Sequence, residues 1–226
     1  MTERLITIDA HEALFLLRNC FSMPKLTYFL RTAPCFLKKN ILLEYDNSIR
    51  NSFKKILNIK LEEQAWNQCT LPVNLGGLGL KLAIEIALPA FLSSVYSSSS
   101  TRKALMPVSI RKDQDHFFEQ GFMEWKTILN HDSLPSNPRF QAEWDKPLYQ
   151  QRQKQLLNSA SSDIERARLL GVASDHASDF LHAIPISSLG LKLSDSFLRV
   201  VCAVRTGSPD VPTTYFPLRR RSGFSR

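Results

Sequence analysis

Apolar residues recur at the spacing of one helical face along most of this chain. The clearest case lies within residues 37–58, where one stripe is formed by Ile41, Leu42, Tyr45, Ile49, Phe53, Ile56 and Leu57. Spacings of three and four residues place side chains on one side of an α-helix, so this stretch predicts a long helix with one buried face. The opposite side would carry polar and basic residues, namely Asn47, Arg50, Asn51, Lys54, Lys55 and Asn58.

Similar spacing, interrupted by proline, predicts shorter helices elsewhere. Pro24 suits the first turn of a helix at residues 25–32, with Ser22 as a candidate cap. Pro89 would kink or divide a helix at 81–95. The chain has only 8 glycines, fewer than the turns of a β-sandwich or barrel usually need, so the predicted fold class is all-α, an irregular helical bundle. The other predicted helices are 3–20, 62–69, 113–129, 141–159, 162–174, 178–184 and 194–204, with loops at 71–80 and 132–138.

These helices are predicted to form two regions. Residues 1–96 would be a basic helical region, residues 97–112, which open with a serine run, a linker, and residues 113–206 a second helical region. The helical period stops after Thr206, so residues 207–226 are predicted to be a disordered basic tail. A weak repeat, L-G-L-K-L at 78–82 and again at 189–193, predicts a tight turn that leads into a helix in both places.

The basic residues are clustered. The chain of 226 residues has a net charge of +8 and is 43% hydrophobic, which indicates a folded protein rather than a disordered one. Residues 18–60 hold nine basic and two acidic residues, a local charge of +7, and the last eight residues add four arginines and no acid. Such clustering favours a polyanion partner, and the alternative is an ordinary solvated surface.

The sequence gives no sign of a membrane partner. The longest apolar stretch, residues 82–95, contains Glu85 and Pro89 and is shorter than the roughly 20 residues of a spanning helix. The first residues include acids where a signal peptide would be basic and then apolar, so we expect an intracellular protein. With no C-x-x-C pair, the cysteines are expected to be reduced core thiols, and the alternative is a metal or disulfide role. They are Cys20, Cys35, Cys69 and Cys202.

Catalytic and metal-binding patterns are incomplete. The Gly-Gly-Leu-Gly segment at 76–79 could present backbone N–H groups to a phosphate, but no Gly-Lys-Ser/Thr follows, which favours a structural turn. His176, Asp179 and His182 are spaced by three on a predicted helix without a fourth ligand nearby, which favours an ordinary amphipathic segment over a metal site. There is no G-x-S-x-G and no Y-x-D-D hairpin. We therefore predict no catalytic residues, no metal and no cofactor, and an independent enzyme is the least favoured hypothesis.

An ordered series of motifs, from LLRNCFSMPKLTYFLRTAPC at residues 16–35 to RVVCAVRTG at 199–207, resembles the segment that follows the polymerase domain in LINE-like retrotransposon polyproteins of animals. The longest is LLRNCFSMPKLTYFLRTAPC at residues 16–35. The series covers about residues 10–207, and it is specific as a set although each motif alone is weak. The other motifs are AW at 65–66, LPV at 71–73, GGLGL at 76–80, AFLSS at 90–94, WDKP at 144–147, ARLL at 167–170, FLHAIP at 180–185, GLKL at 190–193 and RVVCAVRTG at 199–207.

The resemblance implies an origin in a reverse transcriptase polyprotein. The first 60 residues would then resemble the polymerase thumb and the segment after it, and the catalytic carboxylates would lie upstream of this chain. The family continues after the position of Gly207 into a Cys/His-rich stretch, whereas residues 208–226 have neither residue type. This departure implies a frameshift, a splice or a premature stop.

The expected function is that of a non-catalytic fragment of an RNA-directed DNA polymerase polyprotein, which at most binds RNA or RNA–DNA duplex through its backbone. The alternative is a helical protein-interaction or scaffold module without a nucleic-acid role, whose partner would be the missing upstream polymerase domain. Aromatic residues interleave with the basic ones; some could stack on bases, although most have core spacing. These are Phe21, Tyr28, Phe29, Phe36, Tyr45 and Phe53. The expected nucleic-acid-binding residues are Lys25, Arg31, Lys38, Lys39, Arg50, Lys54 and Lys55.

Overall fold

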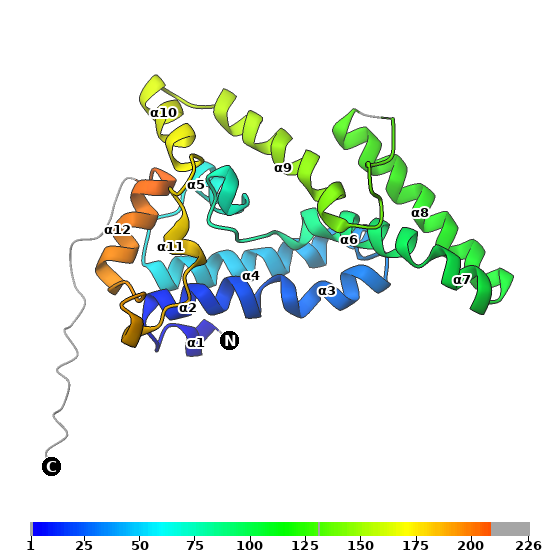
Figure 1. The fold of residues 1–226 in the computed structure, drawn as a ribbon, viewed down its shortest axis with the longest axis horizontal. Coiled ribbons are helices and arrows are strands. Elements are labelled where there is room, and N and C mark those ends of the chain that lie inside the picture. Colours follow the sequence, from blue (N-terminus) through cyan, green and yellow to red (C-terminus); the bar gives the residue numbers. More distant parts are fainter. Residues whose placement is uncertain (1, 131, 209–226) are drawn as a thin grey trace, which may run out of the picture.

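The computed structural model describes residues 2–130 and 132–208, apart from the side chains at 2 and 111–114, and over this range the chain forms helices and no strand (Figure 1). This confirms the predicted all-α class. The first helices are α1 (Thr2–Leu5), α2 (Ala10–Leu16), the π-helix η1 (Leu17–Phe21), α3 (Met23–Thr32), η2 (Cys35–Leu37), α4 (Lys39–Leu57), α5 (Glu63–Cys69) and η3 (Val73–Leu75). The later ones are α6 (Ala83–Ser97), α7 (Ser99–Leu105), α8 (Val108–Leu129), α9 (Gln141–Asn158), α10 (Asp163–Val172), α11 (Asp179–His182), η4 (Ser187–Leu189) and α12 (Asp195–Thr206).

Helix α6 is the centre of one half of the molecule. It contacts α3, α4, α8 and α9, which lie around it (Figure 1). Its sequence is apolar on nearly every side, and such a helix is stable only when other elements cover it. Phe91 and Leu92 are fully buried in this core together with two tryptophans, Trp125 and Trp144, whose rings meet edge to face at 5.1 Å. Pro89 does not divide the helix, which is continuous through it.

The other half is closed by α12. This last helix contacts α2, α4 and α5, so Leu198, Cys202 and Ala203 share a core with Leu14 and Phe53. Residues from the predicted first and second regions therefore pack into one core, and the chain is not packed as two separate halves divided at residues 97–112. A third, smaller cluster joins α9 and α10 through Tyr149, Leu156 and Leu169.

Residues 3–20 do not form the single continuous helix that the sequence predicts. Asp9 has extended backbone angles and separates α1 from α2, and the segment that follows α2 winds as a π-helix. Pro24 lies in the first turn of α3, as predicted. Ser22 does not cap that helix with its side chain, because its hydroxyl instead donates to the Arg18 carbonyl at 3.0 Å.

The predicted linker at 97–112 is mostly helical. Helices α6, α7 and the start of α8 run through it. Ser98, within the serine run, separates α6 from α7, and its hydroxyl donates to the Ser94 carbonyl at 2.8 Å, one turn back in α6. The predicted tail begins with the cap of α12: Gly207 has φ 68°, and the Ser208 amide donates to the Ala203 carbonyl. The rest of that tail, residues 209–226, lies outside the described residues.

The two L-G-L-K-L segments have the predicted turn geometry. Gly79 and Gly190 both have positive φ, 73° and 68°, a conformation that glycine adopts without strain. Each turn leads within five residues into a helix, α6 in the first case and α12 in the second. Among the helices of the described residues, none is both long and apolar enough to cross a lipid bilayer.

Candidate nucleic-acid interface

The seven basic residues expected to bind nucleic acid do not form one surface. Lys25 and Arg31 are exposed on α3, Lys38 is exposed just before α4, and Lys55 is exposed near the end of α4. Helix α4 is 19 residues long, about 28 Å at 1.5 Å per residue, so its two basic ends are far apart. The exposed cations therefore divide into a group on α3 and its continuation, and a second group at the far end of α4.

Two of the seven side chains are paired within the fold. The Lys39 ammonium lies 2.7 Å from Glu124 on α8. Arg50 lies 2.7 Å from the Glu63 carboxylate, and its guanidinium lies over the Trp66 ring at 5.6 Å. These contacts hold α4 against α8 and α5, so neither side chain is a free cation of the kind that a phosphate backbone recruits.

The polar face predicted for α4 is largely present. Asn47, Asn51, Lys55 and Asn58 are exposed, Lys54 is half-buried, and Asn58 ends the helix with φ 50°. The predicted apolar stripe needs one correction, because Ile41 is 64% exposed although Leu42 is buried. Neighbouring residues point about 100° apart on a helix, so these two cannot both face a narrow core.

Helix α3 presents an aromatic and basic face. Tyr28 is 71% and Phe29 60% exposed, and their rings meet edge to face with centroids 5.7 Å apart. Lys25 lies three and four residues before them, which places all three side chains on one side of the helix. The buried side of α3 carries Met23 and Leu30. The sequence alone leaves two alternatives for these aromatic residues, namely base stacking and burial in a core.

The other interleaved aromatic residues belong to the interior. Phe36 is buried in the core around α6, and Phe53 in the core that α12 closes. Tyr45 donates its hydroxyl to the carbonyls of Phe21 and Ser22, at 3.0 and 2.8 Å. Tyr28 and Phe29 therefore differ from the other aromatic residues in their exposure. The sequence pattern that indicates them is their spacing of three and four residues from Lys25, opposite the apolar positions of the same helix.

The glycine-rich segment at 76–79 is a structural turn. The amides of Gly77 and Gly79 donate to the carbonyls of Pro72 and Leu71, so they are not available to a phosphate. A side chain on Gly77 would place its Cβ 2.0 Å from the Leu71 oxygen, which explains why glycine is required there. Arg205, only 4% exposed, fastens this turn through bonds to the carbonyls of Val73 and Gly77.

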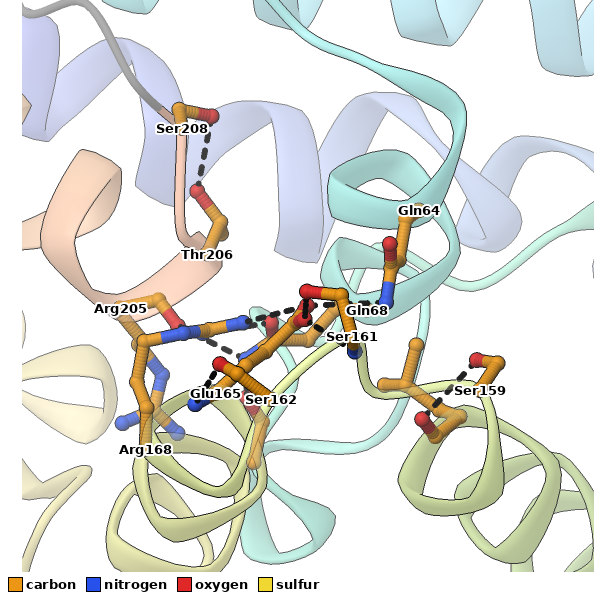
Figure 2. A network of polar contacts seen from close by, with 12 residues as sticks. Gln64, Gln68, Ser159, Ser161, Ser162, Glu165, Arg168, Arg205, Thr206 and Ser208 are labelled. Carbon is orange, nitrogen blue, oxygen red and sulfur yellow. Dashed lines mark hydrogen bonds and ion pairs between the residues drawn. The ribbon is translucent and has the colours of Figure 1, made fainter.

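A polar network joins α5, α10 and α12 (Figure 2). Glu165 accepts hydrogen bonds from Gln64 at 2.9 Å and from the Ser161 hydroxyl at 2.6 Å, and its bonds from Ser161 are the main reason that its pKa is lowered. Arg168 donates to Gln68 and to the Arg205 carbonyl. Each of these polar groups has a partner inside the fold, so we assign the network a structural role in holding the last helices on α5.

The histidine and cysteine patterns do not converge. His176 has φ 64° and lies in a turn rather than on the predicted helix, where its Nδ1 is 3.0 Å from Asp179. Within residues 2–130 and 132–208, no group of three or more His, Cys, Asp or Glu side chains is placed to hold a metal ion. All four cysteines are free, but Cys20 is exposed and Cys35 half-buried, so only Cys69 and Cys202 are the core thiols that the sequence predicted. Burial raises the pKa of Cys202 to about 12.

Comparison of the chain with known protein families, with curated proteins and with solved structures finds no match. The expected relationship to reverse transcriptase polyproteins stays a prediction. Function is therefore inferred from the surfaces of this chain alone.

Proposed function

We propose that this chain is a non-catalytic fragment of a reverse transcriptase polyprotein that binds RNA without sequence preference. The observation that carries the binding part is the exposed face of α3, where Tyr28 and Phe29 follow Lys25 by three and four residues and the Lys25 ammonium lies over the Phe21 ring at 5.0 Å. Exposed aromatic rings next to cations are the usual means of holding a single strand, because bases stack on the rings while phosphates meet the charges. Arg31 and Lys38, both exposed, continue the cationic surface beyond the aromatic pair.

The non-catalytic part of the proposal is supported by what the buried carboxylates do. Asp46 accepts hydrogen bonds from the amides of Ala83 and Ile84 and so caps α6. Glu85 lies 2.5 Å from Arg152, and Asp145 accepts a hydrogen bond from Gln141. Asp46 and Glu85 are thus occupied in holding helices together and Asp145 is bonded within its own helix, whereas metal-assisted phosphoryl transfer needs carboxylates that face a substrate.

Fluorescence anisotropy with a labelled single-stranded RNA of about 16 nucleotides tests the proposal. Tyr28→Ala and Phe29→Ala should each weaken binding by about 1–3 kcal/mol, the usual worth of one base–aromatic stack. Phe140→Ala is the matched control, since Phe140 is also an exposed phenylalanine but lies on a different part of the molecule, just before α9. It should leave binding unchanged.

The charges are tested through the salt dependence of the same binding. Lys25→Gln or Arg31→Gln should each lower the slope of log affinity against log salt by about 0.7, the value for one phosphate contact on a single strand. Arg166→Gln, an exposed arginine on α10, serves as the charge control. A slope that falls equally in all three variants would mean a general charge effect and would remove the assignment to α3. An RNA–DNA duplex of the same sequence shows whether the aromatic face prefers single strands.

A second candidate function follows from the apolar residues beside this face. Leu37 and Ile41 are exposed at the end of η2 and in the first turn of α4, shortly after α3 in the sequence. A protein-interaction module whose partner is the upstream polymerase domain would cover these side chains. It predicts that Ile41→Asn abolishes binding to that domain while RNA binding stays unchanged, and the RNA proposal predicts the reverse for Tyr28→Ala.

A further inference from the structure

A basic cavity lies where three segments that are distant in sequence meet. It has a volume of about 540 Å³ and is bounded by the start of α3, the loop before α6 and the end of α11. Its charged and ring-nitrogen side chains are Arg18, Lys81 and His182. None of the residues that line it is Asp or Glu. A concave surface with cationic donors and no acid is suited to an anion, because its field is not cancelled locally.

Arg18 is held in a fixed position in this cavity. Its Nη1 donates to the Leu181 carbonyl at 2.7 Å, and its Nη2 packs so closely on Gly79 that a Cβ there would be 3.1 Å away. Among the ion pairs of the described residues, none involves Arg18. Burial lowers the pKa of this guanidinium. An arginine that is already held in position and has no acidic partner can bind an anion with little loss of side-chain entropy.

Arg205, a buried arginine in the same region, has a purely structural role. Arg205 donates from all three guanidinium nitrogens, to three backbone carbonyls and to the Ser178 hydroxyl at 2.6 Å. Arg18, in contrast, makes a hydrogen bond through Nη1, and its buried Nε has no partner. All three guanidinium nitrogens of Arg205 therefore have partners, whereas Nε of Arg18 has none. Of these two side chains, only Arg18 lines the cavity.

The remaining groups in the cavity are exposed or neutral donors. Lys81 and His182 are exposed, so both can turn toward a ligand. Asn19 and Asn74 also line the cavity, and the Asn19 amide donates to the Phe15 carbonyl at 3.0 Å. Burial raises the pKa of Asp145, and the charge of Lys81 opposes that rise, but Asp145 is buried on α9 and does not line the cavity.

We propose that this cavity is a phosphate-binding site, with Arg18 as the fixed cation and Lys81 and His182 as the side chains that close on the phosphate. Arginine with lysine is a common pairing for phosphate, since the planar guanidinium orients two oxygens and the ammonium adds a point charge. The phosphate is either a free phosphate ester or a backbone phosphate of RNA lying along α3. The RNA form of the inference rests on the proposed function, and the free form does not.

Titration of inorganic phosphate into the ¹⁵N-labelled full chain tests the site directly. Saturable amide shifts are expected at residues 18–27, 72–81 and 182. Lys81→Gln should weaken this binding about tenfold, the worth of one charge-assisted hydrogen bond. Lys146→Gln is the matched control, since Lys146 is an exposed lysine that lines a different cavity. Shifts spread over all lysines, or equal effects of the two variants, would overturn the proposal.

Arg18 also supports the fold through Leu181, so its removal needs a folding control. Arg18→Lys keeps a charge but loses the oriented pair of donors, and it should weaken phosphate binding while the thermal midpoint and circular dichroism stay near those of the parent. If that variant unfolds, the Lys81→Gln, His182→Gln double variant decides the matter, because both side chains are exposed. Unchanged phosphate affinity in the folded double variant would refute the site.

Two further results separate the sources of the phosphate. If inorganic phosphate competes with RNA and Lys81→Gln weakens both, the site holds a backbone phosphate. If phosphate binds but RNA affinity ignores Lys81→Gln, the site takes a free phosphate ester, and the proposed RNA function is judged by the Tyr28 and Phe29 variants alone. If the chain binds RNA but not phosphate, the proposed RNA function stands and the phosphate site is refuted.

Discussion

Replacement of Asp46 by asparagine should flatten the dependence of stability on pH. Asp46 lies on α4, is 5% exposed, and accepts the amides of Ala83 at 2.7 Å and Ile84 at 3.1 Å. Burial raises the pKa of its carboxyl from 3.8 to about 6, against the opposing effect of these two hydrogen bonds. The folded protein therefore holds a proton on Asp46 over a range in which the unfolded chain has already lost it.

The sign follows from this difference in bound protons. The contribution of Asp46 to stability is complete below the unfolded pKa and is lost as pH rises through the folded pKa. Two pKa units correspond to about 3 kcal/mol, so the free energy of unfolding should fall by about that amount between pH 4 and pH 7 from this group alone. The substitution Asp46→Asn removes the titrating carboxyl and keeps a carbonyl acceptor for one of the two α6 amides, which bind different oxygens of Asp46.

Urea unfolding followed by circular dichroism at pH 4, 5, 6 and 7 measures the effect. The difference between the parent and Asp46→Asn should change by about 3 kcal/mol across this range, with the parent relatively more stable at low pH. Taking the difference removes contributions shared by both proteins, including that of Asp145, whose pKa burial also raises to about 6. Parallel curves, or a difference of opposite sign, would show that the two hydrogen bonds outweigh burial and would refute the reasoning.

Three further substitutions test other parts of the fold. Arg205→Met should destabilise the chain by about 3–5 kcal/mol in urea unfolding, because it leaves buried carbonyls of the 73–77 turn unpaired, whereas the exposed Arg166→Met should change stability by less than about 0.5 kcal/mol. Phe91→Ala should cost about 3–5 kcal/mol through the cavity that it leaves beside Phe36, measured as a lower urea midpoint at unchanged slope. His11 accepts the Leu193 amide at 3.0 Å and has a pKa lowered by burial, so the parent should lose stability relative to His11→Gln as pH falls below about 6.5; equal curves would mean that His11 is protonated without cost.

The helices could be predicted because their signal is local. The stripe formed by Ile49, Phe53 and Ile56 repeats over several turns, and such a period leaves few alternatives to α4. The π-helix at 17–21 has no comparable signal, since it depends on one extra residue per turn. The serine composition of residues 97–100 predicts a loop, whereas the chain makes only a one-residue break there, at Ser98 between α6 and α7.

The site was harder to predict because charge partners are not local. Lys39 is paired with Glu124, 85 residues later, so a count of charges between residues 18 and 60 overstates the free cations. The same count includes Arg18 without showing that it lines a cavity with Lys81 and His182. Only the exposed pair of Tyr28 and Phe29 had a usable local signal, namely their place opposite Met23 and Leu30 on one helix.

Helices from the later part of the chain hold Arg18 and the turn that carries Gly79 in place. Helix α11 provides the Leu181 carbonyl that orients Arg18, and α12 provides Arg205, which fastens the turn that carries Gly79. The cavity exists only after the chain has returned from residue 180 to residue 18, because its walls come from both ends of the sequence. Tertiary contacts thus bring Arg18, from the basic cluster, together with Lys81 and His182 from outside it, and this is why the basic first region and the helices that follow it have to be considered as one folded unit.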